Sequence, residues 1–190
     1  MTDSQIRKLA NLYRSAIEAA RKDGRFVNDI CFKHFPAGCC GDTCDLLAEY
    51  LKFEGVKTIW YSGQRGDWSH AWLVVKDKRV KRPKRPKRPK RPIPSPSLWP
   101  EELQDIVANY GAVRPEQEVD ITRYEFEDLR DGLIIDITGD QFGDYDIPVY
   151  VGYLDPFHQT FDFNRAHEYY GPNDGRLDGL YRVISEYLDK

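Results

Sequence analysis

The chain has 190 residues, and its 41% hydrophobic and 13% aromatic content is sufficient for one domain with a bulky core. No run of about 18 apolar residues is present, which excludes a membrane-spanning helix, and we expect no membrane partner. The formal net charge of −3 argues against a chain whose whole surface binds nucleic acid.

The N-terminal residues predict a helix over 4–22. Apolar residues recur there at helical spacing, Ser4 can cap the helix and Gly24 can end it. The same segment lacks the apolar stretch of a secretory signal peptide. We therefore expect a cytoplasmic protein, with export by a route that needs no signal peptide left open.

Four cysteines, Cys31, Cys39, Cys40 and Cys44, lie close together in the sequence. A disulfide framework spreads its cysteines along the chain, so this cluster indicates thiol chemistry, metal binding or burial instead. A zinc site could combine three of these thiols with His34, but the paired Cys-x-x-Cys spacing of zinc sites is missing. We expect neither a metal nor a cofactor.

The next segment predicts a helix followed by two strands. The helix should begin near Cys40 or Gly41, because the apolar residues that follow recur at helical spacing. Residues 56–63 and 70–75 are rich in β-branched and aromatic side chains, which is typical of strands. The polar residues 64–69 should form the turn between them.

A basic, proline-rich tract follows at about residues 79–97, where the tripeptide Lys-Arg-Pro occurs four times between Lys81 and Pro92. Residues 76–91 contain eleven Lys or Arg residues and one Asp, which leaves 17 of the chain's 28 basic and 30 of its 31 acidic residues elsewhere. Because repeated proline blocks helix and sheet and like charges repel, we expect a solvated low-complexity insertion in a single domain of residues 1–190. Binding of an anionic polymer such as nucleic acid is the less favoured alternative, since the tract has no aromatic residues.

The second half of the chain predicts further elements of both kinds. A short helix is indicated at 100–110, whereas residues 111–130 give no clear pattern. The runs 133–138 and 147–152 predict strands, and 175–188 predicts an amphipathic closing helix. Helices before and after a group of strands are typical of an α+β fold.

Cys40 stands where the second predicted helix begins, directly after a glycine-containing turn. Free N–H groups and the helix dipole stabilise a thiolate at such a position, and the thiolate is the nucleophilic form of cysteine. The same N–H groups can bind the oxyanion of a tetrahedral intermediate, and Gly41 would let a substrate approach the backbone. Cys39 is the rival nucleophile, and simple burial is the alternative role for either thiol.

Two further residues could complete a catalytic triad with Cys40. His70 opens a predicted strand and could accept the thiol proton, although a structural histidine at a strand edge is the alternative. Asp136 interrupts an apolar strand, where a charge needs a partner, and an imidazole N–H is a suitable one. Ile134 and Asp136 should share one face of that strand, and a solvent-facing aspartate on an edge strand is the alternative.

The segments FPAGCCGDTCDLLAEYL, SHAWLVV and LIIDITGDQF together resemble bacterial papain-like and transglutaminase-like proteins. The ordered series of a cysteine at a helix start, a histidine on a strand and an aspartate on a later strand carries the resemblance. It covers about residues 30–75 and 131–155. In transglutaminase-like proteins a short turn joins the histidine and aspartate strands, so residues 79–130 resemble an insertion at that turn.

The resemblance implies N-terminal helices packed on an antiparallel sheet, with Cys40 as nucleophile, His70 as general base and Asp136 as the orienting carboxylate. It implies acyl transfer at amide bonds of a protein or peptide: cleavage, deamidation or transglutamination. The alternative is a catalytically inactive module of this fold that binds a partner.

Other polar residues, some of them near these segments, have weaker sequence contexts. Gln141 could line the substrate or oxyanion site together with Cys39 and Gly41, although it could equally cap a turn. The remaining histidines have no motif around them and are expected to be ordinary surface or core residues; they are His34, His158 and His167.

Overall fold

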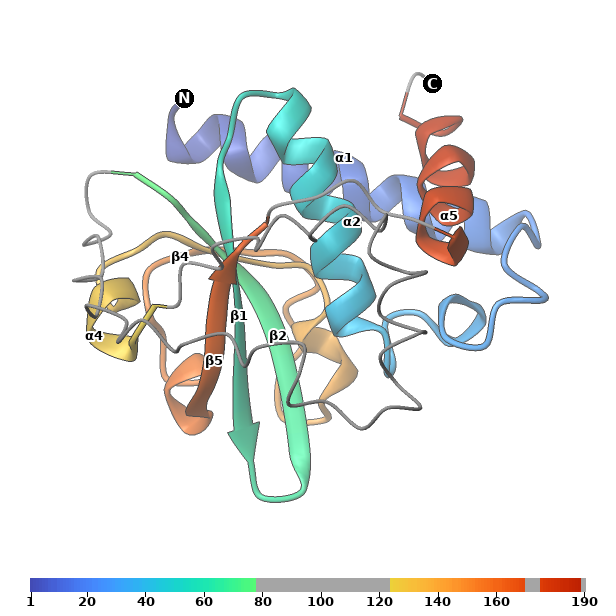
Figure 1. The fold of residues 1–190 in the computed structure, drawn as a ribbon. Coiled ribbons are helices and arrows are strands. Elements are labelled where there is room, and N and C mark those ends of the chain that lie inside the picture. The colour runs from blue at the N-terminus through green and yellow to red at the C-terminus, as the bar shows by residue number, and fades with distance from the viewer. Residues whose placement is uncertain (78–123, 170–174, 189–190) are drawn as a thin grey trace, which may run out of the picture. The chain divides into compact units, whose positions relative to one another are not determined.

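The computed structural model describes residues 1–77, 124–169 and 175–188, which all belong to one compact unit (Figure 1). The Lys-Arg-Pro repeats and the helix predicted at 100–110 lie outside the described residues. The fold is α+β, with an N-terminal helix packed on a five-stranded antiparallel sheet, which confirms the predicted class. None of the helices in these ranges combines the length and the apolar character needed to cross a membrane.

Helix α1 spans Asp3–Lys22 and buries one apolar face, close to the predicted bounds. The predicted cap is wrong by two residues, because Thr2 caps the helix instead of Ser4. The Thr2 hydroxyl accepts a hydrogen bond from the Gln5 N–H at 3.2 Å, and the Gln5 side chain accepts one from the Thr2 N–H at 2.8 Å. This reciprocal pair satisfies two N–H groups that a helix start leaves free.

Helix α2, Cys40–Phe53, begins where the sequence predicts. Strands β1, Thr58–Arg65, and β2, Trp68–Val75, form a hairpin that is longer than predicted, because Arg65 pairs with Trp68 and leaves a two-residue turn. The outer pairs, Gln64 with Ser69 and Arg65 with Trp68, lie beyond the core, and only Trp68 in them is apolar, so hydrophobic periodicity gave no sign that they belong to strands.

The remaining elements are shorter. Strands β3, Ile134–Asp136, and β4, Tyr150–Gly152, lie inside the predicted runs, and helix α5, Gly175–Ser185, inside the predicted closing helix. Helix α4, Phe126–Leu129, falls in a segment without a clear pattern, and strand β5, Asp162–Glu168, was not predicted.

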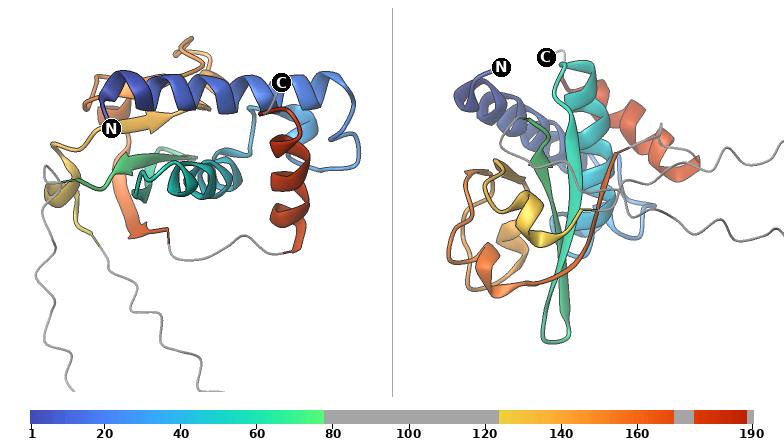
Figure 2. Two further views of the ribbon diagram at one scale, coloured as in Figure 1. Left: turned by 90° about the horizontal axis from the view of Figure 1, so that it is seen from above. Right: turned by 60° about the vertical axis from the view of Figure 1, so that its left-hand side comes forward.

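The strand order is β4-β3-β2-β1-β5, and each face of the sheet packs on its own apolar core. Helices α1, α2 and α5 contribute to the first core, on the face of β2 that carries Leu73. Helix α4 and the segment around Phe157 contribute to the second, on the face that carries Trp72. Figure 2 shows these two groups on opposite sides of the β1–β2 hairpin. Burial of both faces explains why the central strands read as nearly continuous apolar runs.

Candidate active site

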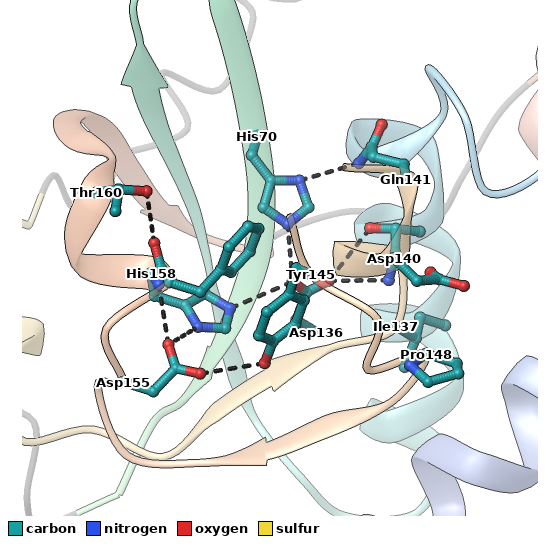
Figure 3. Close-up of polar contacts among 12 residues, drawn as sticks. His70, Asp136, Ile137, Asp140, Gln141, Tyr145, Pro148, Asp155, His158 and Thr160 are labelled. Carbon is teal, nitrogen blue, oxygen red and sulfur yellow. Dashed lines mark hydrogen bonds and ion pairs between the residues drawn. The ribbon is translucent and has the colours of Figure 1, made fainter. Parts of the chain in front are cut away.

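His70 and Asp136 lie side by side on neighbouring strands. Strands β2 and β3 pair antiparallel, with Leu73 opposite Ile135. The two side chains are buried, and Nε2 of His70 lies 2.7 Å from Oδ2 of Asp136 (Figure 3). The alternative of a solvent-facing aspartate on an edge strand is wrong, because Asp136 is 2% exposed and β3 lies between β4 and β2.

The Asp136 carboxylate has four hydrogen-bond donors around it. Oδ1 accepts from the N–H and the hydroxyl of Thr138, at 2.9 and 3.2 Å. Oδ2 faces Nε2 of His70 and, at 3.2 Å, Nε2 of His158. Burial alone would raise the pKa of Asp136, but the charge on His70 and the hydrogen bonds from both histidines hold it far below its usual range. Asp136 is therefore a fixed, ionised acceptor.

The His70 ring has distinct partners on its two nitrogens. Nε2 faces Asp136, whereas Nδ1 lies 3.1 Å from Nε2 of Gln141. Burial lowers the pKa of His70, but the neighbouring Asp136 charge outweighs it and raises the pKa to about 9. The Asp136 charge therefore favours a second proton on the His70 ring, whereas the 3.1 Å contact with the Gln141 amide belongs to the neutral ring, in which Nδ1 accepts.

Cys40 is the first residue of α2 and is partly exposed, whereas Cys39 and Cys44 are buried. Burial raises the pKa of Cys40, but hydrogen bonding and charge from His70, with smaller help from the Ala71 backbone and Gln141, bring it below that of a free thiol. Burial raises the pKa of Cys39 to about 12, and its thiol donates to the Pro36 carbonyl at 3.2 Å. Among these three thiols, only Cys40 has its pKa lowered.

Gln141 joins the loop before α2 to the His70 ring. It ends the 3₁₀ turn Gly139–Gln141, and its Oε1 accepts a hydrogen bond from the Gly38 N–H at 3.1 Å. Gly38 has a φ of 72°, a left-handed conformation that favours glycine. Because Gly38 fixes the carbonyl end of the amide, the Nε2 end points to His70.

A pocket of about 570 Å³ opens over these groups. Cys40 and Gln141 form part of its wall, and Trp68, 69% exposed at the end of the hairpin, forms another part. Neither Cys39 nor Gly41 lines this pocket. The other lining residues are Ala37, Gly38, Arg65, Asp67, Ser69, Phe142, Gly143 and Asp144.

Arg14 of α1 holds the turn that carries Gln141. Its guanidinium donates to both carboxylate oxygens of Asp140, at 2.9 and 2.8 Å, and to the Ile137 carbonyl at 2.7 Å. Its side chain is only 8% exposed. Gln141 is therefore positioned by a buried, bidentate ion pair directly before it.

Replacing Arg14 with methionine should destabilise the fold by about 3 kcal/mol, because it leaves Asp140 without its buried partner. Turnover should fall as well, since the Gln141 turn loses its support. Thermal melting and activity measured on the same preparation test both effects. The matched control is Arg25→Met, which breaks the exposed Arg25–Glu186 pair and should change the melting temperature much less. Equal losses in the two variants would show that Arg14 has no special structural role.

His158 is the residue that sequence reasoning missed. It begins the 3₁₀ turn His158–Thr160, its side chain is fully buried, and it bonds Asp136 from the side opposite the pocket. The only sequence signal is a polar residue among aromatic ones, between Phe157 and Phe161. The other two histidines agree with expectation, since His34 is exposed and His167 stacks on Trp60.

The zinc alternative has no support in the part of the chain that the structure describes. No group of three or more His, Cys, Asp or Glu side chains there is arranged to hold a metal ion.

Comparisons with protein-family models, with curated proteins and with solved structures gave no significant match. The functional assignment therefore rests on the geometry of Cys40, His70, Asp136 and Gln141.

Proposed function

We propose that the chain is a cysteine-nucleophile enzyme that transfers acyl groups at amide bonds, with a papain-like or transglutaminase-like arrangement of its triad. One observation carries the proposal. His70 has one nitrogen on a buried, ionised aspartate and the other directed to the pocket wall that Cys40 and Gln141 form. This is the arrangement that a general base needs beside a thiol nucleophile.

The reaction begins with transfer of the Cys40 thiol proton to Nδ1 of His70. The thiolate attacks the amide carbonyl of the substrate, and the new C–S bond gives a tetrahedral intermediate with a negative oxygen. As the C–N bond breaks, the His70 Nδ1–H donates its proton to the leaving nitrogen. Water, or an amine in transglutamination, then attacks the acyl-enzyme, giving its own proton to His70, and the sulfur leaves.

Gln141 has a different partner in each protonation state. While His70 is neutral, the Gln141 amide donates to the Nδ1 lone pair, as the 3.1 Å contact indicates. Once Nδ1 carries a proton, the Gln141 N–H and the His70 N–H are both donors and repel each other. The Gln141 amide then turns to the Cys40 thiolate or to the substrate oxyanion. The other oxyanion donor in this proposal is the free N–H of Cys40 at the start of α2, because Cys40 lines the pocket whereas Gly41 does not.

The protonation states give the pH dependence of the site. Iodoacetamide should label Cys40 well below pH 8 and leave Cys39 and Cys44 of the native protein unlabelled. Turnover should fall as pH rises through about 9, because His70 then loses the proton that the leaving nitrogen requires. Peptide mapping by mass spectrometry at each pH identifies the labelled thiol. Labelling of Cys40 only above pH 8.5, as for an ordinary thiol, would refute activation.

The class of reaction can be identified with a peptide mixture analysed by mass spectrometry. Hydrolysis divides a peptide in two, deamidation converts a side-chain amide to an acid, and transglutamination joins two peptides with loss of ammonia. An activated Cys40 without any such product would favour the inactive binding module. Trp68, exposed at the pocket rim, offers a flat surface for a peptide side chain.

A further inference from the structure

A second histidine lies directly behind the proposed triad. Nε2 of His158 lies 3.2 Å from Oδ2 of Asp136, the same oxygen that contacts His70. Nδ1 of His158 lies 2.5 Å from Oδ1 of Asp155. Asp155 in turn accepts hydrogen bonds from the His158 N–H at 2.9 Å and from the Tyr145 hydroxyl at 3.1 Å. Figure 3 shows this series running from His70 away from Gln141.

Both ring nitrogens of His158 therefore face carboxylate oxygens. A neutral imidazole has one N–H and one lone pair, so it can donate to only one of the two carboxylates. The imidazolium form donates to both, and it places a positive charge between Asp136 and Asp155. With His158 in this form, the buried Asp136 and the partly buried Asp155 face two histidines, and the cluster becomes neutral when His70 also carries its proton.

Among the described residues, the structure shows no charged group in contact with His158 other than these two carboxylates. The ring is enclosed by aromatic side chains from three elements, with centroid distances of 4.9 Å to Trp72, 5.1 Å to Tyr150 and 5.2 Å to Phe157. The titratable groups that face it are Asp136, Asp155, Tyr145 and Tyr150. Water has little access, so the two carboxylates decide the state of the ring.

We propose that His158 is a positioning residue of the same site: an imidazolium, held by Asp155, that fixes Asp136 against His70 and adds a positive charge behind the thiolate–imidazolium pair. The inference rests on the proposed function of Cys40 and His70. It assigns His158 no contact with substrate, because the ring is buried behind Asp136. Its effect is on the proton equilibria of the pair.

The test is the pH dependence of Cys40 alkylation by iodoacetamide in His158→Gln. Glutamine keeps a donor for Asp136 but removes the charge. A positive charge behind the Cys40–His70 pair favours loss of the pair's protons, so removing that charge makes those protons harder to remove. The alkylation midpoint should therefore move to higher pH by about one unit or more.

The matched control is His34→Gln, the same substitution at an exposed histidine, which should leave the midpoint in place. Thermal melting establishes that each variant is folded. A folded His158→Gln protein with an unchanged midpoint would overturn the proposal. An unactivated Cys40 in the unmodified protein would instead refute the proposed function, so the two failures are distinguishable.

A second measurement applies even where His158→Gln fails to fold. Nitrogen NMR of the full chain with ¹⁵N-labelled histidine, assigned through the His34→Gln, His70→Gln and His167→Gln variants, reports each ring nitrogen separately. Protons on both nitrogens of His158 at pH 7 are the expected result. A lone pair on either nitrogen would overturn the proposal. Asp155→Asn, which keeps an acceptor but removes the charge, should lose one of these protons in the same spectrum.

Discussion

Cys40→Ala should abolish turnover, with a loss of at least about 10⁴-fold, whereas Cys39→Ala and Cys44→Ala should keep most of it. The physical reason is the difference between the three thiols. Cys40 lines the pocket and has its pKa lowered, with His70 responsible for most of that effect, whereas burial raises the pKa of Cys39 and of Cys44. Product formation from the peptide mixture measures the effect.

The two other cysteine variants are matched controls for Cys40→Ala, since each removes one sulfur from the same short segment. Their melting temperatures should fall slightly, because both thiols are buried. Complete loss of turnover in Cys39→Ala, with an unchanged melting temperature, would move the nucleophile one residue back along the chain.

Asp136→Asn should lower turnover by roughly 10-fold to 1000-fold. An amide in place of the carboxylate cannot accept from all four donors, and it removes the charge that keeps His70 protonated. The fold should also lose about 2–3 kcal/mol of stability, because buried donors are left unpaired. Turnover and chemical denaturation, measured together, test both expectations. Unchanged turnover would make Asp136 a structural residue.

The pH dependence of stability gives Asp136→Asn a second signature. The pKa of Asp136 is far lower in the folded chain than in an unfolded one, so its stabilisation is present above about pH 4 and is lost as pH falls below that. The variant should therefore lose less stability on acidification than the unmodified protein does. Asp131→Asn, at an exposed aspartate before β3, is the control and should retain the normal acid sensitivity.

The sequence predicted the elements that hydrophobic pattern determines. Helices α1 and α2 present apolar residues at helical spacing to one core, whereas strands β1, β2 and β3 present them alternately to both cores. The pairing of β2 with β3 followed from the resemblance. Strand β5 was missed because it is an edge strand in which only Ala166 is buried. Its polar residues face outward, so its place in the sheet depends on pairing with β1, which local pattern does not reveal.

The residues of the candidate site also divide into those that local pattern could identify and those that it could not. Asp136 could be singled out because a charge inside an apolar strand needs a partner, and His70 was the partner that the strand order offered. His158 could not be found in this way, because a short turn brings it to Asp136 through contacts that are distant in sequence. The partly buried ion pair of Arg14 with Asp140 is equally non-local. Arg14 falls on the apolar face of α1, at helical spacing from Ala10 and Ile17, but that pattern does not identify its partner.

The position of the proposed triad between two cores has a consequence for folding. Cys40 packs against the helical core, whereas the His70 ring lies among Trp72, Phe142 and Phe161 of the other core, 5.1–5.5 Å away. A chain in which only one core has formed holds a cysteine without its base, or a base without its cysteine. Under the proposed function, the nucleophilic reactivity of Cys40 therefore requires both cores, and a chain that lacks either core carries an ordinary thiol at this position.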